Sequence, residues 1–224
     1  MNQILGIGRS GLNANQKKMD ALSDHIANVS TDGYKKKEVQ FQELLSNEDR
    51  SVGARSGVLK ADYSQGGLRE TDYPYDLAIE GQGFFGLTDE NGNVFFTRNG
   101  AFQLSQDGFL TDKEGNRVII EQQGNFQNRE PAIDEIPLFT VENLQSLIHL
   151  GKGRYLPDGE ANVINSIENP EAFGSIQAGF LENSNSDLTK ALTEMITTQR
   201  AYSLNTKTIQ STDEIMRLIN EMKR

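Results

Sequence analysis

Apolar residues recur at intervals of seven near both ends of this chain, and that spacing constrains the fold more than any other feature. A sevenfold interval keeps one narrow stripe of a helix facing a partner helix, as in the seam of a coiled coil. The sequence therefore predicts a helix over residues 2–31 and a second helix over residues 187–222. The predicted assembly seam consists of Leu5, Leu12, Met19, Ile26, Leu188, Met195, Tyr202, Ile209 and Met216. The alternative is that each stripe is an ordinary core face of a globular protein.

The alternate seam positions are mostly small or polar. They are held by Gly8, Asn15, Ala191, Thr198, Asn205 and Thr212. A polar seam weakens an isolated helix pair and lets a crowded bundle fix its register. Gly6, Gly8 and Gly11 each cost about 1 kcal/mol relative to Ala in a helix interior. The first helix therefore needs packing partners to persist. Ser186-Asp187 can cap the start of the second helix, and Gly33 can end the first.

The middle of the chain has a different pattern, typical of strands. From Asp76 to about Glu121, short apolar or aromatic runs alternate with turn residues. Two of the turns, Thr88–Asn93 and Thr111–Asn116, are near copies, and both read as tight turns of hairpins. Residues 131–180 suggest further strands and a short helical stretch near Leu144–Leu147. The fold class predicted is α+β, with a helix and junction over 1–45, an extended connector over 46–75, a β-rich outer domain over 76–180 and a C-terminal helix over 181–224.

Composition excludes several classes of function. The net charge of −10 and the pI near 4.8 argue against nucleic acid and against anionic lipid surfaces. Cysteine is absent, which removes disulfides, thiol catalysis and cysteine-based zinc sites. A transmembrane helix needs about 18 or more consecutive apolar residues, and the sequence contains no such run. The N-terminus lacks the basic and apolar segments of a cleaved secretory signal, so export would need another route.

Motifs that suggest chemistry are weak. Gly81–Gly86 spells the G-x-G-x-x-G of a dinucleotide loop, but a strand follows it where that loop needs a helix, so a turn between strands is favoured. The turn at Asp89 lacks the spacing of an EF-hand. His25 and His149 have no third partner that would suggest a metal site. The sequence predicts no catalytic residue, no cofactor and no metal.

A resemblance appears at Ala27-Asn28-Val29-Ser30-Thr31-Asp32-Gly33-Tyr34-Lys35. This segment resembles the A-N-x-x-T-x-G-Y-K signature of the bacterial flagellar rod and hook protein family, with matches at Ala27, Asn28, Thr31, Gly33, Tyr34 and Lys35. Further matches follow in family order along most of the chain: Gln65–Thr71, Asp76–Phe85, Thr97–Phe102, Gly179–Asn185 and Met195–Tyr202. The connector and residues 121–175 match less clearly.

The resemblance implies an axial component of the flagellar basal body in the cell envelope, most similar to a larger rod protein, proximal or distal. In that family the terminal helices form the inner layer of a tube that transmits torque to hook and filament. The expected partners are further copies, other rod and hook proteins, and the flagellar type III export apparatus, without nucleic acid or membrane insertion. Tyr34 and Lys35 are expected to fix the junction between helix and outer domain. The alternatives are a short hook-type protein, or a secreted carbohydrate-binding or enzymatic β domain with helical tails.

Overall fold

The computed structural model describes residues 2–45, 51–120, 135–159, 162–167 and 169–222, with side chains described over 6–40 and from 60 onward within these ranges. The chain divides into two compact units. The helical unit comprises Met1–Ala27, Lys37–Asp62 and Ser186–Arg224, and the sheet unit comprises Asn28–Lys36 and Tyr63–Asn185. Terminal helices and a central, sheet-rich part confirm the predicted α+β class.

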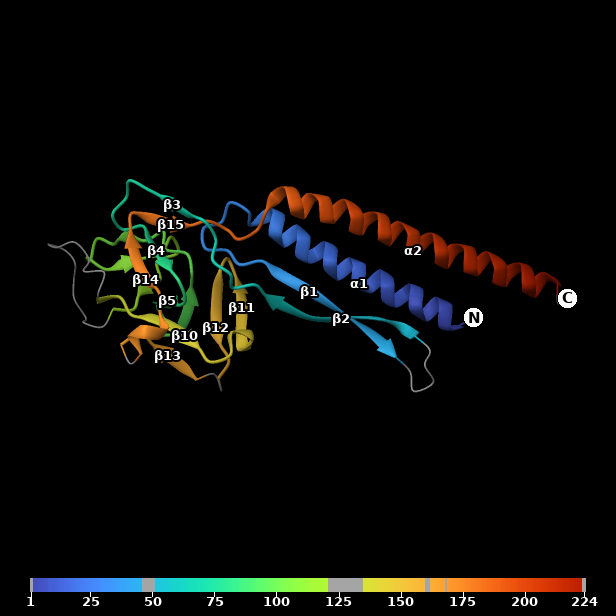
Figure 1. Cartoon of the computed structure of the whole chain (residues 1–224), viewed down its shortest axis with the longest axis horizontal. Coiled ribbons are helices and arrows are strands. Elements are labelled where there is room, and N and C mark those ends of the chain that lie inside the picture. Colours follow the sequence, from blue (N-terminus) through green and yellow to red (C-terminus); the bar gives the residue numbers. More distant parts are fainter. Residues whose placement is uncertain (1, 46–50, 121–134, 160–161, 168, 223–224) are drawn as a thin grey trace. The chain divides into compact units, whose positions relative to one another are not determined.

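The helical unit contains α1 (Asn2–Ala27), β1 (Lys37–Leu45), β2 (Ser51–Ala61) and α2 (Leu188–Met222). The two helices lie side by side and run in opposite directions (Figure 1). β1 and β2 form an antiparallel hairpin that also contacts α1. Among the described residues, neither helix combines the length and the apolar character that crossing a bilayer requires.

The helix ends follow local chemistry. The Lys190 amide donates to the Asp187 carboxylate at 3.0 Å, and the Ala191 amide donates to the Asp187 carbonyl at 2.9 Å. Asp187 is therefore the N-cap of α2, one of the two residues predicted for that position. At the other helix, α1 ends four residues earlier than the predicted residue 31. A turn follows, in which the Thr31 amide donates to the Asn28 carbonyl at 3.1 Å.

The β1–β2 hairpin was not predicted. Residues 37–45 were assigned to the junction after the first helix, and 46–75 to an extended connector, but Lys37 pairs with Ala61 and the ladder continues to Leu45 and Ser51. Residues 51–61 lack a clear apolar alternation and contain Gly53 and Gly57, so the local pattern gave no strand signal. The division at residues 45, 75 and 180 remains a prediction.

The sheet unit is built from short, mostly antiparallel strands around β5. Its elements are β3 (Leu68–Glu70), β4 (Leu77–Glu80), β5 (Phe84–Thr88), β6 (Val94–Thr97), β7 (Gln103–Leu104), β8 (Leu110–Thr111), β9 (Arg117–Val118), β10 (Leu138–Val141), η2 (Leu144–Ser146), β11 (Leu147–Gly151), β12 (Arg154–Pro157), β13 (Val163–Asn165), η3 (Pro170–Ala172), β14 (Ser175–Ala178) and β15 (Phe180–Glu182). β5 pairs with β6, β9 and β10. The strands predicted between residues 77 and 120 and the short helical stretch near residue 144 are confirmed.

Aromatic and aliphatic side chains fill the sheet unit from both sides of β5. Phe85 meets Phe102 edge to face with ring centres 5.2 Å apart, within an aliphatic cluster. Phe84 points into a second cluster beside Tyr155 and Tyr63. Burial raises the pKa of Tyr63 to about 12 and also raises that of Tyr155, so both phenols stay neutral at physiological pH. Phe84 and Phe85, which are neighbours on β5, thus point to opposite sides of the strand and pack into two different clusters.

The near-identical turns adopt the same geometry. In each, the amides of the second and fourth following residues donate to the aspartate carboxylate, of Asp89 in one turn and Asp112 in the other. The side-chain amide of Asn93 also donates to Asp89, and this bond, followed by the backbone bonds, lowers the pKa of Asp89. Gly92 and Gly115 supply the positive φ. The hairpin interpretation is confirmed: the carboxylates are used to hold turns.

The far end of the sheet unit returns to its beginning. β14 pairs with β4, and β15 pairs with β3. The Gly33 amide also donates to the Glu182 carbonyl at 2.6 Å, and the Asn185 amide to the Tyr34 carbonyl at 3.2 Å. Segments far apart in sequence are therefore held together by backbone hydrogen bonds.

Gly100→Ala is expected to lower the free energy of unfolding of the sheet unit by about 3 kcal/mol, at the upper end of the overpacking range. A Cβ at Gly100 would lie only 1.6 Å from the Leu77 carbonyl oxygen, which is backbone and cannot swing away. Urea denaturation followed by tyrosine fluorescence measures the change. Gly92→Ala is the matched control, because a Cβ at Gly92 meets nothing within 4 Å and only the φ of 84° disfavours the alanine. Equal losses in the two variants would contradict the packing argument.

Candidate functional site

The inward face of α2 packs against α1 and contains most of the predicted seam. Met195, Tyr202, Ile209 and Met216 are half-buried, as are Leu12, Met19 and Ile26 on α1. Leu188 is 42% exposed, and the side chain of Leu5 lies outside the described residues. These facts concern packing within one chain. The role of these residues in assembly remains a prediction.

The helices approach each other closely at two glycines of α1. A Cβ added at Gly8 would lie 2.8 Å from Ile209 Cγ1, and one added at Gly11 would lie 2.9 Å from Asn205 Nδ2. These glycines weaken an isolated helix, but here they make room for the side chains of α2. Gly6 has nothing within 4 Å and plays no such part.

Polar residues on α2 are accommodated by bonds to their own helix. Thr198 is buried, and its hydroxyl donates to the Glu194 carbonyl at 2.7 Å. Thr212 makes the equivalent bond to Thr208 at 2.8 Å. A threonine whose hydroxyl bonds the carbonyl four residues earlier presents its methyl group to the neighbouring helix at low cost. The small and polar line predicted along α2 is therefore compatible with close packing.

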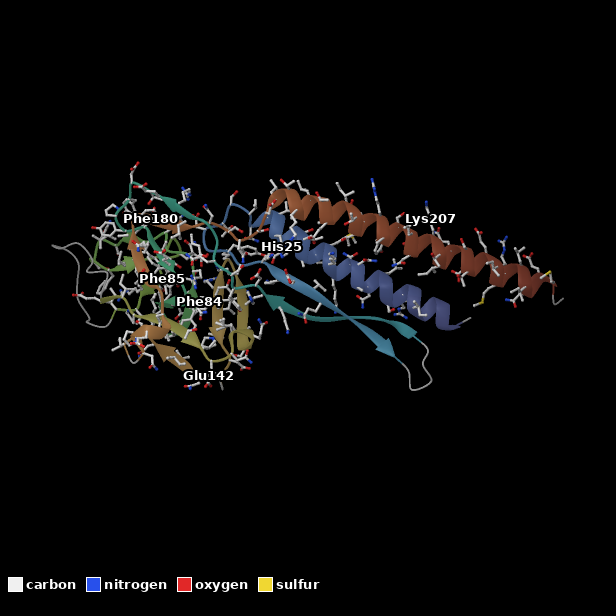
Figure 2. All side chains as sticks on the ribbon, in the orientation of Figure 1. His25, Phe84, Phe85, Glu142, Phe180 and Lys207 are labelled. Carbon is white, nitrogen blue, oxygen red and sulfur yellow. The ribbon has the colours of Figure 1, made fainter. Side chains whose placement is uncertain are left out.

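Other faces of α2 carry large apolar side chains that the described part of the chain leaves exposed. They are Leu188, Leu192, Ile196, Leu204, Ile215, Leu218, Ile219 and Met222. They share the outer surface with charged groups such as Lys207, which points away from α1 (Figure 2). Exposed apolar groups in this density on one helix are typical of a surface that binds another protein.

The signature segment lies in the sheet unit, apart from Ala27, which ends α1. Asn28 and Thr31 form a turn in which the Thr31 hydroxyl donates to the Asn28 side-chain oxygen at 3.2 Å. Gly33 has a φ of 69°, and a Cβ there would meet the Arg98 carbonyl carbon at 2.4 Å. Tyr34 is buried. Glycine is required at residue 33 by conformation and by space.

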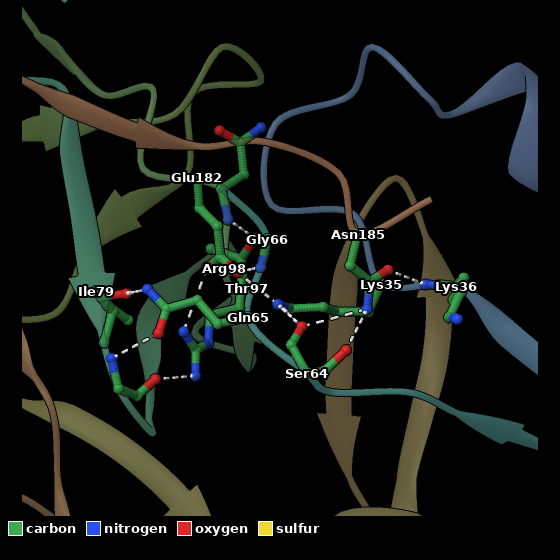
Figure 3. Close-up of polar contacts among 12 residues, drawn as sticks. Lys35, Lys36, Ser64, Gln65, Gly66, Ile79, Thr97, Arg98, Glu182 and Asn185 are labelled. Carbon is green, nitrogen blue, oxygen red and sulfur yellow. Dashed lines mark hydrogen bonds and ion pairs between the residues drawn. The ribbon is translucent and has the colours of Figure 1, made fainter. Parts of the chain in front are cut away.

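Lys35 is the centre of a buried ionic network (Figure 3). Its ammonium donates to Glu182 Oε1 at 2.5 Å and to the Ser64 carbonyl at 2.6 Å. Arg98 donates to Glu182 Oε2 at 3.2 Å and to the Gly81 carbonyl at 2.8 Å. The side chains of Lys35 and Glu182 are fully buried, and that of Arg98 is 4% exposed. Three charges removed from water persist only because each is paired and hydrogen-bonded.

Glu182 is the anion of this network and serves two cations. The Gly66 amide also donates to its Oε1 at 2.8 Å. Burial lowers the pKa of Arg98, and the charge of Glu182 opposes that shift. The guanidinium remains charged because its ordinary pKa is so high. Two of the segments that carry the family resemblance contain Glu182 and Arg98, but the sequence alone singled out neither residue.

The network and its neighbours lie within the sheet unit, near residues where segments of that unit begin or end. Lys36 donates its amide to the Asn185 side-chain oxygen at 2.8 Å, and Asn185 Nδ2 donates to the Ser64 carbonyl at 3.2 Å. Residues 36, 63 and 185 are the points where segments of the sheet unit end or begin. The bonds from the Lys35 ammonium to Glu182 and Ser64 lie within the sheet unit. The expected role of Lys35 at the junction remains a proposal.

The glycine turn and the two histidines that the sequence offered as candidates for ligand binding make structural contacts. Gly81–Gly83 is the turn between β4 and β5, as the sequence predicted. His25 Nε2 accepts from the Lys37 amide at 3.0 Å, and His149 packs edge to face on Tyr155. Within the described ranges, no three or more His, Cys, Asp or Glu side chains come together as metal ligands would.

A polar hollow of about 330 Å³ in the sheet unit includes Lys152, Arg154 and Glu114 in its lining. The sequence did not predict it. Glu114 binds Lys152 at 2.6 Å and Arg154 at 2.8 Å, and the bond from Lys152 lowers the pKa of Glu114. A single carboxylate therefore pairs with two cations in this hollow.

Three family models match the chain, and their ranges include residues of both helices and of the network. Residues 5–35 match the family described as flagella basal body rod protein, residues 78–142 the flagellar hook protein FlgE/F/G D1 domain, and residues 177–222 the flagellar basal body rod FlgEFG protein C-terminal region. The network residues Lys35 and Arg98 and the carboxylate of Glu182 each come from a different one of these three regions.

Relatives match over nearly their whole length. The flagellar basal-body rod protein FlgG of Buchnera aphidicola subsp. Schizaphis graminum is 30% identical, over 97% of this chain and 98% of its own. FlgG of Bacillus subtilis is 29% identical over 100% of both chains. FlgF of Mesorhizobium japonicum is 26% identical over 98% of each chain. The chain therefore belongs to the flagellar basal-body rod protein family, as a structural subunit of the rod.

Proposed function

We propose that this subunit polymerises through α1 and α2 into the tubular shaft that transmits torque to the hook and filament. The observation that supports the proposal is the outer surface of α2. Leu192, Ile196, Leu218 and Met222 are between 46% and 81% exposed although they are large and apolar. Complete burial of a fully exposed large apolar side chain contributes about 1.5–3 kcal/mol, so burying the exposed half of such a residue contributes roughly half as much. A helix with this surface is stabilised by assembly.

The subunit reaches the basal body of the cell envelope through the flagellar type III export apparatus, without a cleaved signal peptide. Its partners are further copies of itself and other rod and hook proteins. This part of the proposal rests on family membership and on the absence of cysteine from the sequence. Order in the glycine-bearing α1 is completed on assembly, when neighbouring subunits offset its ordering cost.

No catalytic step is part of the proposed function. The buried charges serve each other, and the described histidines make structural contacts. A carbohydrate-binding or enzymatic β domain is not favoured, because the relatives are named for the rod. The same names disfavour the curved hook-type alternative.

Met195→Asp is expected to block polymerisation and to leave the sheet unit folded. Met195 is half-buried in the face of α2 that packs on α1, so a carboxylate there separates the helices or holds an unpaired charge between them. Rods are counted by electron microscopy of basal bodies isolated from the native cells. Circular dichroism of the purified variant reports the strands. Met195→Leu is the control and should assemble normally. Straight rods built from the aspartate variant would refute assembly through this helix pair.

A further inference from the structure

α2 is longer than the helix it packs on. Gly8 lies against Ile209 and Gly11 against Asn205, so continuing this antiparallel register roughly places the first residue of α1, Asn2, opposite Ile215. By this register the last turns of α2, which end at Met222, extend beyond the start of α1, and Figure 1 shows the same overhang of the helix. This extension cannot be covered by α1.

The exposed apolar residues near the two ends of α2 form separate patches. The start patch comprises Leu188, Leu192 and Ile196, each one helical turn after the last and 42–51% exposed. The end patch comprises Ile215, Leu218, Ile219 and Met222, which are 37–81% exposed. With a rise of 1.5 Å per residue, the patch centres lie roughly 40 Å apart along the helix. They cannot meet within one chain.

The patches lie on opposite flanks of the helix. At about 100° per residue, the start patch is turned by about a quarter of a circle from the face that packs on α1. The end patch is turned by a similar angle in the other direction. A second copy of α2 laid parallel to the first, and shifted along it, therefore presents its end patch to the start patch of its neighbour.

Charges beside the patches fit the same arrangement. Arg200 is exposed one turn after Ile196, on the outer side of the start patch. Glu214 and Glu221 are exposed within one turn of Leu218, on the outer side of the end patch. With the patch centres aligned, Glu221 of one copy lies roughly 8 Å along the helix from Arg200 of its neighbour, on the same side of the contact, and Glu214 lies farther away.

We propose that the end patch of one copy packs on the start patch of the next, with the two α2 helices parallel and offset by roughly 40 Å. Different surfaces meet in this contact, so it is heterologous and each copy binds two neighbours. Such a contact propagates as an open polymer. The inference rests on the proposed function and names the surfaces that the polymer uses.

The absence of cysteine from the sequence makes the contact directly testable. Full-length chain carrying Leu192→Cys and Leu218→Cys is assembled in the native cells, and isolated rods are oxidised. A disulfide needs Cα atoms within about 7 Å, so it forms only across a close contact. The expected product is a ladder of dimers, trimers and longer species, at least about tenfold more abundant than the product of either single variant. Two further pairs, Leu192→Cys with Ile215→Cys and Leu192→Cys with Met222→Cys, test for a contact one turn earlier or one turn later on the end patch.

The matched control is Lys190→Cys with Leu218→Cys. Lys190 is exposed at the same height on α2 but faces nearly the opposite way from the start patch, so it should give no ladder. Should the cysteine variants fail to assemble, a photoreactive residue at Leu218 alone is used in their place. Its adduct is expected on residues 188–196 of another copy.

Each other outcome has a distinct meaning. Dimers from Leu192→Cys alone would show a two-fold contact and overturn the proposal. Intact rods without a ladder from any of the three pairs, or adducts on a different axial protein, would also overturn it while leaving the proposed function standing. Isolated rods that lack this protein altogether would overturn the proposed function itself.

Discussion

Glu182→Gln is expected to lower the free energy of unfolding of the sheet unit by about 3–5 kcal/mol. The carboxylate of Glu182 is fully buried between the ammonium of Lys35 and the guanidinium of Arg98. Glutamine keeps the shape of the side chain and one acceptor oxygen, but it removes the negative charge of the network. Two buried cations then face each other without compensation. Urea denaturation followed by circular dichroism measures the loss.

Two further variants make this prediction specific. Lys35→Met should cost less than Glu182→Gln, because Glu182 and Arg98 remain as a neutral pair and the Gly66 amide still donates to the carboxylate. Glu90→Gln, on an exposed turn, should change stability by no more than about 0.5 kcal/mol. If Glu182→Gln behaved like Glu90→Gln, the network would contribute nothing to stability. If Lys35→Met cost the most, the charge argument would be wrong.

Leu218→Asp is expected to abolish rod assembly while the isolated subunit remains as stable as the parent, within about 0.5 kcal/mol. Leu218 is 53% exposed and lies where α2 extends past α1, so a carboxylate there stays in water in the free subunit. In the polymer the same carboxylate would be buried against an apolar patch without a partner. Electron microscopy of isolated basal bodies measures assembly, and thermal unfolding of purified protein measures stability.

Gln210→Asp is the control for added charge. Gln210 is also exposed on α2, but it faces away from the end patch, so its variant should assemble. Normal rods built from Leu218→Asp would show that the end patch is not an assembly surface. Loss of assembly in both variants would instead indicate sensitivity to charge anywhere on the helix.

Local sequence patterns predicted the elements well. The helices follow from apolar spacing, and Asp187 caps α2 as an N-cap residue should. The strands between residues 77 and 120 follow from apolar runs separated by turns, and Asp89 and Asp112 hold those turns through bonds to nearby amides. In each case the deciding interaction is between residues within a few positions of each other.

The sevenfold stripe leaves the half-buried face of α2 at Leu188, its first residue on that helix. A straight α-helix drifts about 20° per heptad, so a strict line from Leu188 to Met216 turns by roughly 80° over four heptads. Met195 to Met216 stay within the half-buried face, whereas Leu188 is exposed beside Leu192. The heptad count alone could not show that Leu188 is exposed in the single chain, and its role in assembly stays a prediction.

Long-range pairing is what the sequence could not supply. Lys35 and Glu182 are 147 residues apart, and neither lies in a pattern that predicts an ion pair. The β1–β2 hairpin likewise depends on pairing that no local alternation announces. The family resemblance marked the segments that contain the network without showing that they converge on one carboxylate.

Hydroxyl-radical footprinting of the subunit, free and in isolated rods, tests most directly whether this chain is a rod subunit assembled through α2. In the free subunit Leu192, Leu218 and Met222 should react readily, because all three are exposed. In rods their reactivity should fall by about tenfold or more, as for side chains buried at an interface. Ile148 and Leu150, exposed on the sheet unit, provide the internal reference. Unchanged reactivity of α2 in rods that contain the protein would contradict the account.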